Sequence, residues 1–135
     1  YFDSGHKGSV CQLYTFFGKP TWRFETKDGY YVPFIHELRE DTKSGSSSYP
    51  FYVDPTRNIN ESDVVVLDDV CMQHYSWVRK YIERKCLNSS ARENIKKGTM
   101  LTDYHDPKLG PGFYVKDYDK KLIEVPDYFN LSRLF

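Results

Sequence analysis

Acidic and imidazole side chains gather just after the most apolar run of the chain. Asp68 and Asp69 follow Val64–Leu67, and His74 comes five residues later. Carboxylate oxygens and imidazole nitrogens hold divalent metal ions such as Mn²⁺ or Mg²⁺, and a carboxylate also serves as a general base. These residues therefore predict a site for acid–base or metal-assisted chemistry.

A second group of polar residues supports the same chemistry. His36 and Glu37 end an earlier apolar segment, and Arg79, Lys80 and Arg84 supply cations beyond His74. Arg and Lys neutralise phosphate charge, so carboxylates, imidazoles and cations together suit a divalent ion bound to a pyrophosphate. The set does not by itself exclude purely structural roles.

Two secondary-structure elements are needed to position the acids and the histidine. The β-branched run Val64–Leu67 predicts a strand that is buried on both faces. A helix is predicted from about Val70 to Leu87, because apolar residues recur there at steps of three and four. These residues are Cys71, Tyr75, Val78, Ile82 and Cys86.

The junction between this strand and this helix is the expected site. Ligands of open α/β sheets bind at the carboxyl ends of strands, where Asp68 and Asp69 would lie. His74 and Trp77 would share one flank of the helix. Two structural alternatives stay open, because Asp before a helix is a common cap and His74 can be a packed polar residue.

The remaining elements are predicted from strand and turn signals. Strands are expected at 10–17, 21–26 and 30–36, a short helix from Ser90 to Gly98, and a hairpin over 113–125. Pro33 places the third strand at a sheet edge or a bulge, since proline has no N–H to donate. The Ser/Gly-rich stretch Lys43–Ser48 is predicted to be mobile, either as a lid or as an inert linker.

Composition defines the class of protein. The 135 residues predict a single mixed α/β (α+β) domain, with a mixed sheet, one long helix and one short helix. Lys plus Arg and Asp plus Glu both number 19, which argues against a nucleic-acid partner. No run is apolar enough for a membrane span. The three cysteines, with no CxxC pair, predict reduced buried thiols and a cytoplasmic protein.

Several enzyme classes lack their signatures. The sequence has no glycine-rich phosphate loop, dinucleotide fingerprint, HExxH motif or paired-cysteine zinc spacing. Cysteine nucleophiles are disfavoured, because inert cysteines are the buried ones and these three lie in apolar patterns.

Three segments resemble a known family. The stretch Met72–Lys80, followed by Asn88–Arg92, resembles the region late in the catalytic domain of family 2 glycosyltransferases, especially phage and bacterial members. Tyr30–Glu37 is similar to the His-Glu segment that these enzymes carry upstream. The resemblance covers roughly residues 20–95 and implies the acceptor-side half of a GT-A fold.

The resemblance also implies partners and roles. It implies a nucleotide-sugar donor, a glycan or other hydroxyl acceptor, and a divalent metal ion, Mn²⁺ or Mg²⁺. The implied roles are catalytic for Glu37, Asp68 and Asp69, substrate-binding for His36, Trp77, Arg79 and Lys80, and metal-binding for His74. The nucleotide-binding half of the family precedes this region, so we expect the chain to be a fragment that is inactive alone.

A rival from another class is a non-catalytic module. Aromatic residues make up 17% of the chain, with twelve Tyr and nine Phe. Such residues suit surfaces that contact sugars or proteins. This interpretation predicts a glycan-binding or assembly role, for example in a phage particle.

Overall fold

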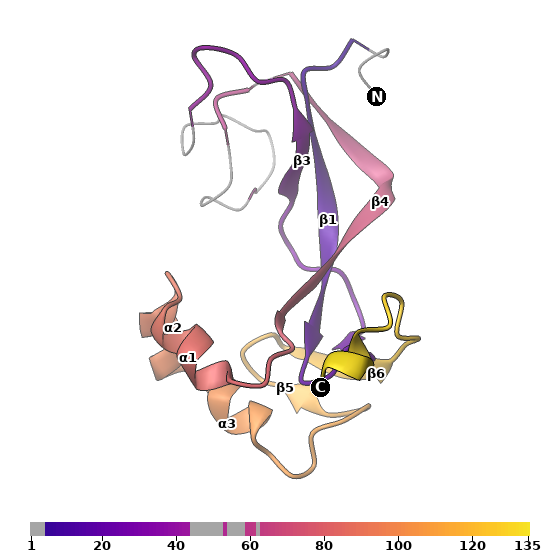
Figure 1. Cartoon of the computed structure of the whole chain (residues 1–135), viewed down its shortest axis with the longest axis vertical. Helices are drawn as coiled ribbons and strands as arrows, with labels where there is room; N and C mark the ends of the chain where they lie inside the picture. The colour runs from indigo at the N-terminus through magenta and orange to yellow at the C-terminus, as the bar shows by residue number, and fades with distance from the viewer. Residues whose placement is uncertain (1–4, 44–52, 54–58, 62) are drawn as a thin grey trace. The chain divides into compact units, whose positions relative to one another are not determined.

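A computed structural model describes residues 5–43, 53, 59–61 and 63–135 of the chain (Figure 1). Strands and helices are both present in this part, so the predicted mixed α+β class is confirmed. The strands are β1 (Gly8–Phe17), β2 (Trp22–Phe24), β3 (Val32–His36), β4 (Val64–Trp77), β5 (Tyr114–Val115) and β6 (Lys120–Glu124). The helices are α1 (Ile82–Leu87), α2 (Arg92–Lys97), α3 (Met100–Tyr104) and the 3₁₀ helix η2 (Leu131–Leu134).

The described strands form one sheet in the order β3-β1-β2-β6-β5, with β4 also paired to β1. The pairs whose register is defined are antiparallel. The chain divides into two compact units, and β1 and β4 contribute residues to both. The first unit comprises Tyr1–Tyr14 and Lys27–Met72, and the second comprises Thr15–Thr26 and Gln73–Phe135.

In the first unit, β1 lies between β3 and β4 (Figure 1). Its side chains Cys11 and Leu13 are buried with Val32 of β3, and Val70 and Met72 of β4 pack against them. Val70 and Met72 are two residues apart, which is the spacing that puts side chains on one face of a strand. A small apolar core therefore joins the three strands.

Pro33 sits where the sequence predicts. The strand β3 ends the sheet order, and the register of its pairing with β1 shifts between Gly8 and Val10. An edge strand with an irregular ladder tolerates a residue that has no N–H group to donate.

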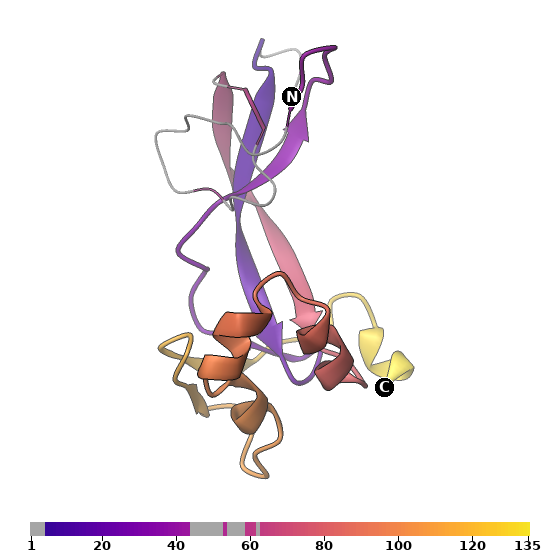
Figure 2. The same ribbon diagram turned by 90° about the vertical axis from the view of Figure 1, so that its left-hand side faces the viewer.

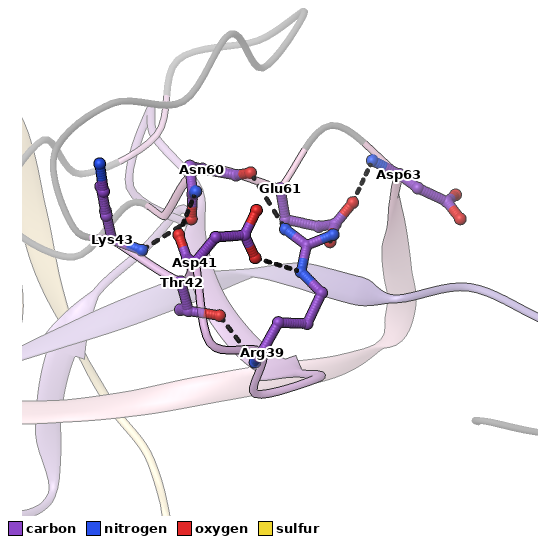
Figure 3. A network of polar contacts seen from close by, with 7 residues as sticks. All are labelled: Arg39, Asp41, Thr42, Lys43, Asn60, Glu61 and Asp63. Atoms are coloured by element: carbon purple, nitrogen blue, oxygen red, sulfur yellow. Dashed lines mark hydrogen bonds and ion pairs between the residues drawn. The ribbon is translucent and has the colours of Figure 1, made fainter.

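A polar network holds two chain segments of the first unit together (Figure 3). Nη1 of Arg39 lies 3.1 Å from Oε2 of Glu61, whose side chain is 5% exposed. Asn60 donates a hydrogen bond from Nδ2 to the carbonyl of Asp41 and accepts one at Oδ1 from the backbone N–H of Lys43. Of the predicted mobile stretch, only Lys43 is described, and residues 44–48 lie outside the described part.

The second unit contains a larger aromatic core. Phe17 is fully buried, and its ring centroid lies 5.5 Å from those of Trp77 and Tyr104 and 6.0 Å from that of Phe24. Burying a residue such as Phe stabilises the fold by roughly 1.5–3 kcal/mol. The buried members of this core are Phe17, Phe24, Trp77, Ile82, Cys86, Ile95, Met100, Val115 and Leu122.

The hairpin predicted over 113–125 is confirmed as β5 and β6, and β6 pairs with β2. The short helix predicted to stop at Gly98 is also confirmed, although Ser90 does not cap it through a side chain. Gly98 allows a close approach, because a Cβ there would lie 2.1 Å from Oδ2 of Asp117. That carboxylate accepts a hydrogen bond from the backbone N–H of Thr99, at the start of α3.

The prediction of one long helix from Val70 to Leu87 is wrong. Residues up to Trp77 continue the strand β4, and the helix α1 begins only at Ile82. Spacings of three and four were compatible with a helix, but pairing with β1 decides the outcome, and β-branched and aromatic side chains favour strands. Asp68 and Asp69 consequently lie inside a strand and not at a strand-to-helix junction.

None of the three cysteines is paired in a disulfide. Cys11 and Cys86 are buried, as predicted, and Cys71 is half-buried. Burial raises the pKa of the Cys11 and Cys86 thiols, which disfavours the reactive thiolate. Among the described helices, none has the length and apolar character needed to cross a membrane.

Candidate functional site

The first unit holds the acids proposed for catalysis and the histidine beside one of them. His36 ends β3, where it is half-buried, and Glu37 follows it with an exposed side chain. Asp68 and Asp69 are exposed near the middle of β4. These positions leave the carboxylates accessible, but none of the four residues lines a hollow described below.

The second unit holds the other predicted site residues. Nδ1 of His74 lies 3.3 Å from Oγ1 of Thr15, which is fully buried. Trp77 is 5% exposed and belongs to the aromatic core, so most of its ring is unavailable to a ligand. Arg79 and Lys80 are exposed directly after β4.

The two groups thus belong to different compact units. The prediction that Glu37 and His74 face one pocket stays a prediction. Its geometric premise is wrong, however, because His74 lies on a strand and not on the first turns of a helix.

Metal binding was predicted through His74. Within residues 5–43, 53, 59–61 and 63–135, no group of three or more His, Cys, Asp or Glu side chains is placed to hold an ion. The described residues do not make a fitting ligand set, and we derive no step through a metal.

A hollow in the second unit gathers Arg79 and Lys80 with further cations. Its volume is about 720 Å³. We call it the cationic pocket, and its lining residues are Val78, Arg79, Lys80, Tyr81, Arg84, Lys85, Asn88, Ser89, Ser90 and Phe135. Four cationic side chains and three hydroxyls line this space, and none of the lining side chains carries a carboxylate. The pocket is therefore suited to an anion.

The local fold explains how Arg79 is positioned. Its backbone N–H donates to the hydroxyl oxygen of Tyr104, and its carbonyl accepts from the same hydroxyl at 2.6 Å. Its Nε donates to the carbonyl of Ser76 at 3.2 Å. Tyr104 also packs on Phe17, so the aromatic core fixes the position of the Arg79 backbone at the pocket.

Lys85 lines the pocket with a half-buried side chain. Its Nζ lies 4.2 Å from the centre of a Trp77 ring, a distance typical of a cation–π contact. Burial lowers the pKa of Lys85, with Arg79 adding to the effect and Cys86 opposing it. A half-buried ammonium group gains from an anionic ligand, which would offset the cost of desolvation.

Sequence reasoning missed part of this pocket. Arg79, Lys80 and Arg84 were singled out as cations, but Lys85 and Tyr81 were not. The helix prediction placed all of them on one continuous helix, whereas the chain turns between Trp77 and Ile82 and thereby creates the hollow.

Comparison with known proteins gives no family. No family model matches the chain, and neither the curated proteins nor the solved structures contain a match. The resemblance to glycosyltransferases stays a prediction from the sequence.

Proposed function

We propose that the chain is the acceptor-side part of a glycosyltransferase, which transfers a sugar from a nucleotide-sugar to a hydroxyl acceptor. In this proposal the cationic pocket receives the diphosphate of the donor. One observation carries the proposal. Two segments of the family resemblance, Met72–Lys80 and Asn88–Arg92, are separated in sequence, yet residues of both line this pocket.

The chemistry of the lining supports a diphosphate. Arg79 presents a planar fork of donors that matches two phosphate oxygens, and Lys80 adds a point charge. The hydroxyls of Ser89 and Ser90 supply neutral donors. As the glycosidic bond to the donor breaks, negative charge grows on the diphosphate, and fixed cations stabilise that charge.

The roles of the acids follow from the resemblance. Glu37, or Asp68 or Asp69, would act as the base that removes the proton from the acceptor hydroxyl. His36 would contact substrate, and His74 would reach the diphosphate. These assignments rest on the resemblance, and the nucleotide-binding half of the enzyme would come from another part of a larger protein.

The test is binding of nucleoside diphosphates by isothermal titration calorimetry, with Mn²⁺, with Mg²⁺ and with EDTA. We expect Arg79→Gln to weaken binding roughly tenfold or more, because hydrogen bonds to charged groups contribute about 1.5–3 kcal/mol. The matched control is Lys7→Gln, which removes an exposed cation of the first unit. Equal affinities of the wild type and Arg79→Gln contradict the proposed role of the pocket.

A non-catalytic module that binds glycans or proteins is the second candidate. Tyr81 and Phe135 line the same pocket and are 72% and 55% exposed. Exposed aromatic rings stack on sugars and also anchor protein interfaces. Glycan binding that is lost in Tyr81→Ser, together with no nucleotide binding, would favour this candidate over the enzyme.

A further inference from the structure

A second hollow adjoins the cationic pocket on α1. It has a volume of about 330 Å³ and is lined by Tyr81, Glu83, Arg84 and Leu87. Tyr81 and Arg84 line the cationic pocket as well, so the two hollows share a wall. Tyr81 and Leu87 are 72% and 66% exposed. Large apolar side chains are therefore presented to solvent beside an arginine.

An apolar groove continues from this hollow. It encloses about 250 Å³ and shares Glu83 and Leu87 with the second hollow. Its other lining residues come from α1, α2 and the first turn of α3. These three short helices lie near one another in the ribbon diagram (Figure 2). These residues are Cys86, Arg92, Ile95, Lys96 and Leu101. The exposed surface of the groove is almost wholly apolar, which suits a hydrocarbon chain better than a polar ligand.

The charged side chains that line the second hollow and the apolar groove differ in whether they have an ionic partner. Nε2 of His105 lies 2.5 Å from Oε1 of Glu83, so this carboxylate already has a partner. Arg92 and Lys96 lie 3.8 and 3.5 Å from a carboxylate oxygen of Glu93. Arg84 forms no ion pair with any described residue.

We propose that the second hollow and the apolar groove form a site for an anionic amphiphile of the alkyl phosphate class. The phosphate lies on Arg84, and the hydrocarbon chain passes over Leu87 into the groove. The combination carries the inference, because a phosphate alone would gain nothing from the groove, and an alkane would gain nothing from Arg84. The inference goes beyond the proposed function and needs no nucleotide-sugar.

The test measures binding of decyl phosphate to the whole chain at concentrations where this amphiphile is monomeric. Leu87→Asn is expected to weaken binding roughly tenfold, the effect of removing one well-covered leucine contact. Arg84→Gln is expected to weaken it by a similar factor. Leu38→Asn is the matched control, since Leu38 belongs to the first unit and is 82% exposed, and it should bind normally.

Further measurements separate the contributions of the phosphate group and the hydrocarbon chain of the ligand. Decanol and inorganic phosphate should each bind far more weakly than decyl phosphate. If either one binds as tightly, or if Leu87→Asn binds like the wild type with an unchanged circular dichroism spectrum, the inference is overturned. A second variant, Leu101→Asn, tests the groove from α3 and should also weaken binding.

Nucleoside diphosphate binding distinguishes this inference from the proposed function. It should persist in Leu87→Asn, because Leu87 does not line the cationic pocket. Binding of decyl phosphate without any binding of nucleoside diphosphates would support the amphiphile site and contradict the proposed function.

Discussion

The two compact units are stabilised in different ways. In the described part of the first unit, the apolar core cluster has three buried side chains, and an ion-pair network joins two chain segments. In the second unit, nine buried residues form a core with several aromatic contacts. A small core stabilises little by itself, so the first unit should depend more on its polar contacts than the second does.

The difference also bears on function. The aromatic core of the second unit contacts the backbone of Arg79 through Tyr104 and holds Lys85 over Trp77, so packing and ligand-binding geometry are linked. In the first unit, the candidate acids Glu37, Asp68 and Asp69 are exposed. A site built on a rigid core is positioned more precisely than one on exposed side chains.

The largest effect is expected in the aromatic core. Phe17→Ala should reduce the free energy of unfolding by about 3–5 kcal/mol, because a fully buried ring is lost and a cavity remains. Both tryptophans, Trp22 and Trp77, lie in the second unit, so their fluorescence during urea unfolding reports this loss. Phe34→Ala removes a ring that is 44% exposed and serves as the control. Similar losses in both variants would contradict the described core.

The network of the first unit should give the next largest effect. Arg39→Met leaves the carboxylate of Glu61 buried without its cation, which should cost about 2–3 kcal/mol, below the full value for a buried pair because Arg39 is partly exposed. The variant Arg39→Met with Glu61→Leu should recover part of the stability, since it removes the unpaired charge.

Labelling of Cys11 by iodoacetamide is the measurement for this network, because this thiol is buried in the first unit. Faster labelling in Arg39→Met, with an unchanged tryptophan transition, shows that the units lose structure separately. If the tryptophan transition shifts equally, the two units unfold as one and the comparison drawn above fails.

A smaller effect is expected at the start of α3. Asp117→Ala removes the acceptor for the backbone N–H of Thr99, 2.8 Å away, and should cost about 1 kcal/mol, the usual value for a lost cap. Gly98→Ala should act through the same contact, because its new Cβ displaces the carboxylate. The double variant should therefore lose little more than either single variant, and additive losses in urea unfolding would disprove the shared cause.

Local signals in the sequence predicted most strands but not the boundary between β4 and α1. Turn residues such as Gly18-Lys19-Pro20 separate the end of β1 from the start of β2, and such turn signals are local in the sequence. The spacing of Ile82 and Cys86 was also informative, since both are buried on α1. The same spacing was misleading before Val78, because pairing of β4 with β1 depends on residues about sixty positions away.

The candidate site was predictable only in part. Charge type singled out Arg79, Lys80 and Arg84 without the structure. The pocket itself depends on a turn after Trp77 and on Tyr104, which belongs to a helix that the sequence did not predict. That helix begins beside Asp117, a contact across 18 positions that no local pattern encodes.

The smallest expected effect is a loss of stability at low pH that arises from a carboxyl group on the surface of the second unit. A hydrogen bond from its own backbone N–H, and then the contact with His105, hold the pKa of Glu83 below its usual value of 4.5. A carboxyl group with a lowered pKa in the folded state stabilises the fold above its unfolded pKa, and this contribution is lost as the pH falls through the folded pKa. The wild type should therefore lose slightly more stability than Glu83→Gln between about pH 6 and pH 3. Thermal unfolding of both proteins measures the difference, with Glu124→Gln as an exposed control from β6. Parallel curves for Glu83→Gln and the wild type would contradict the predicted contribution of the Glu83 carboxylate to stability.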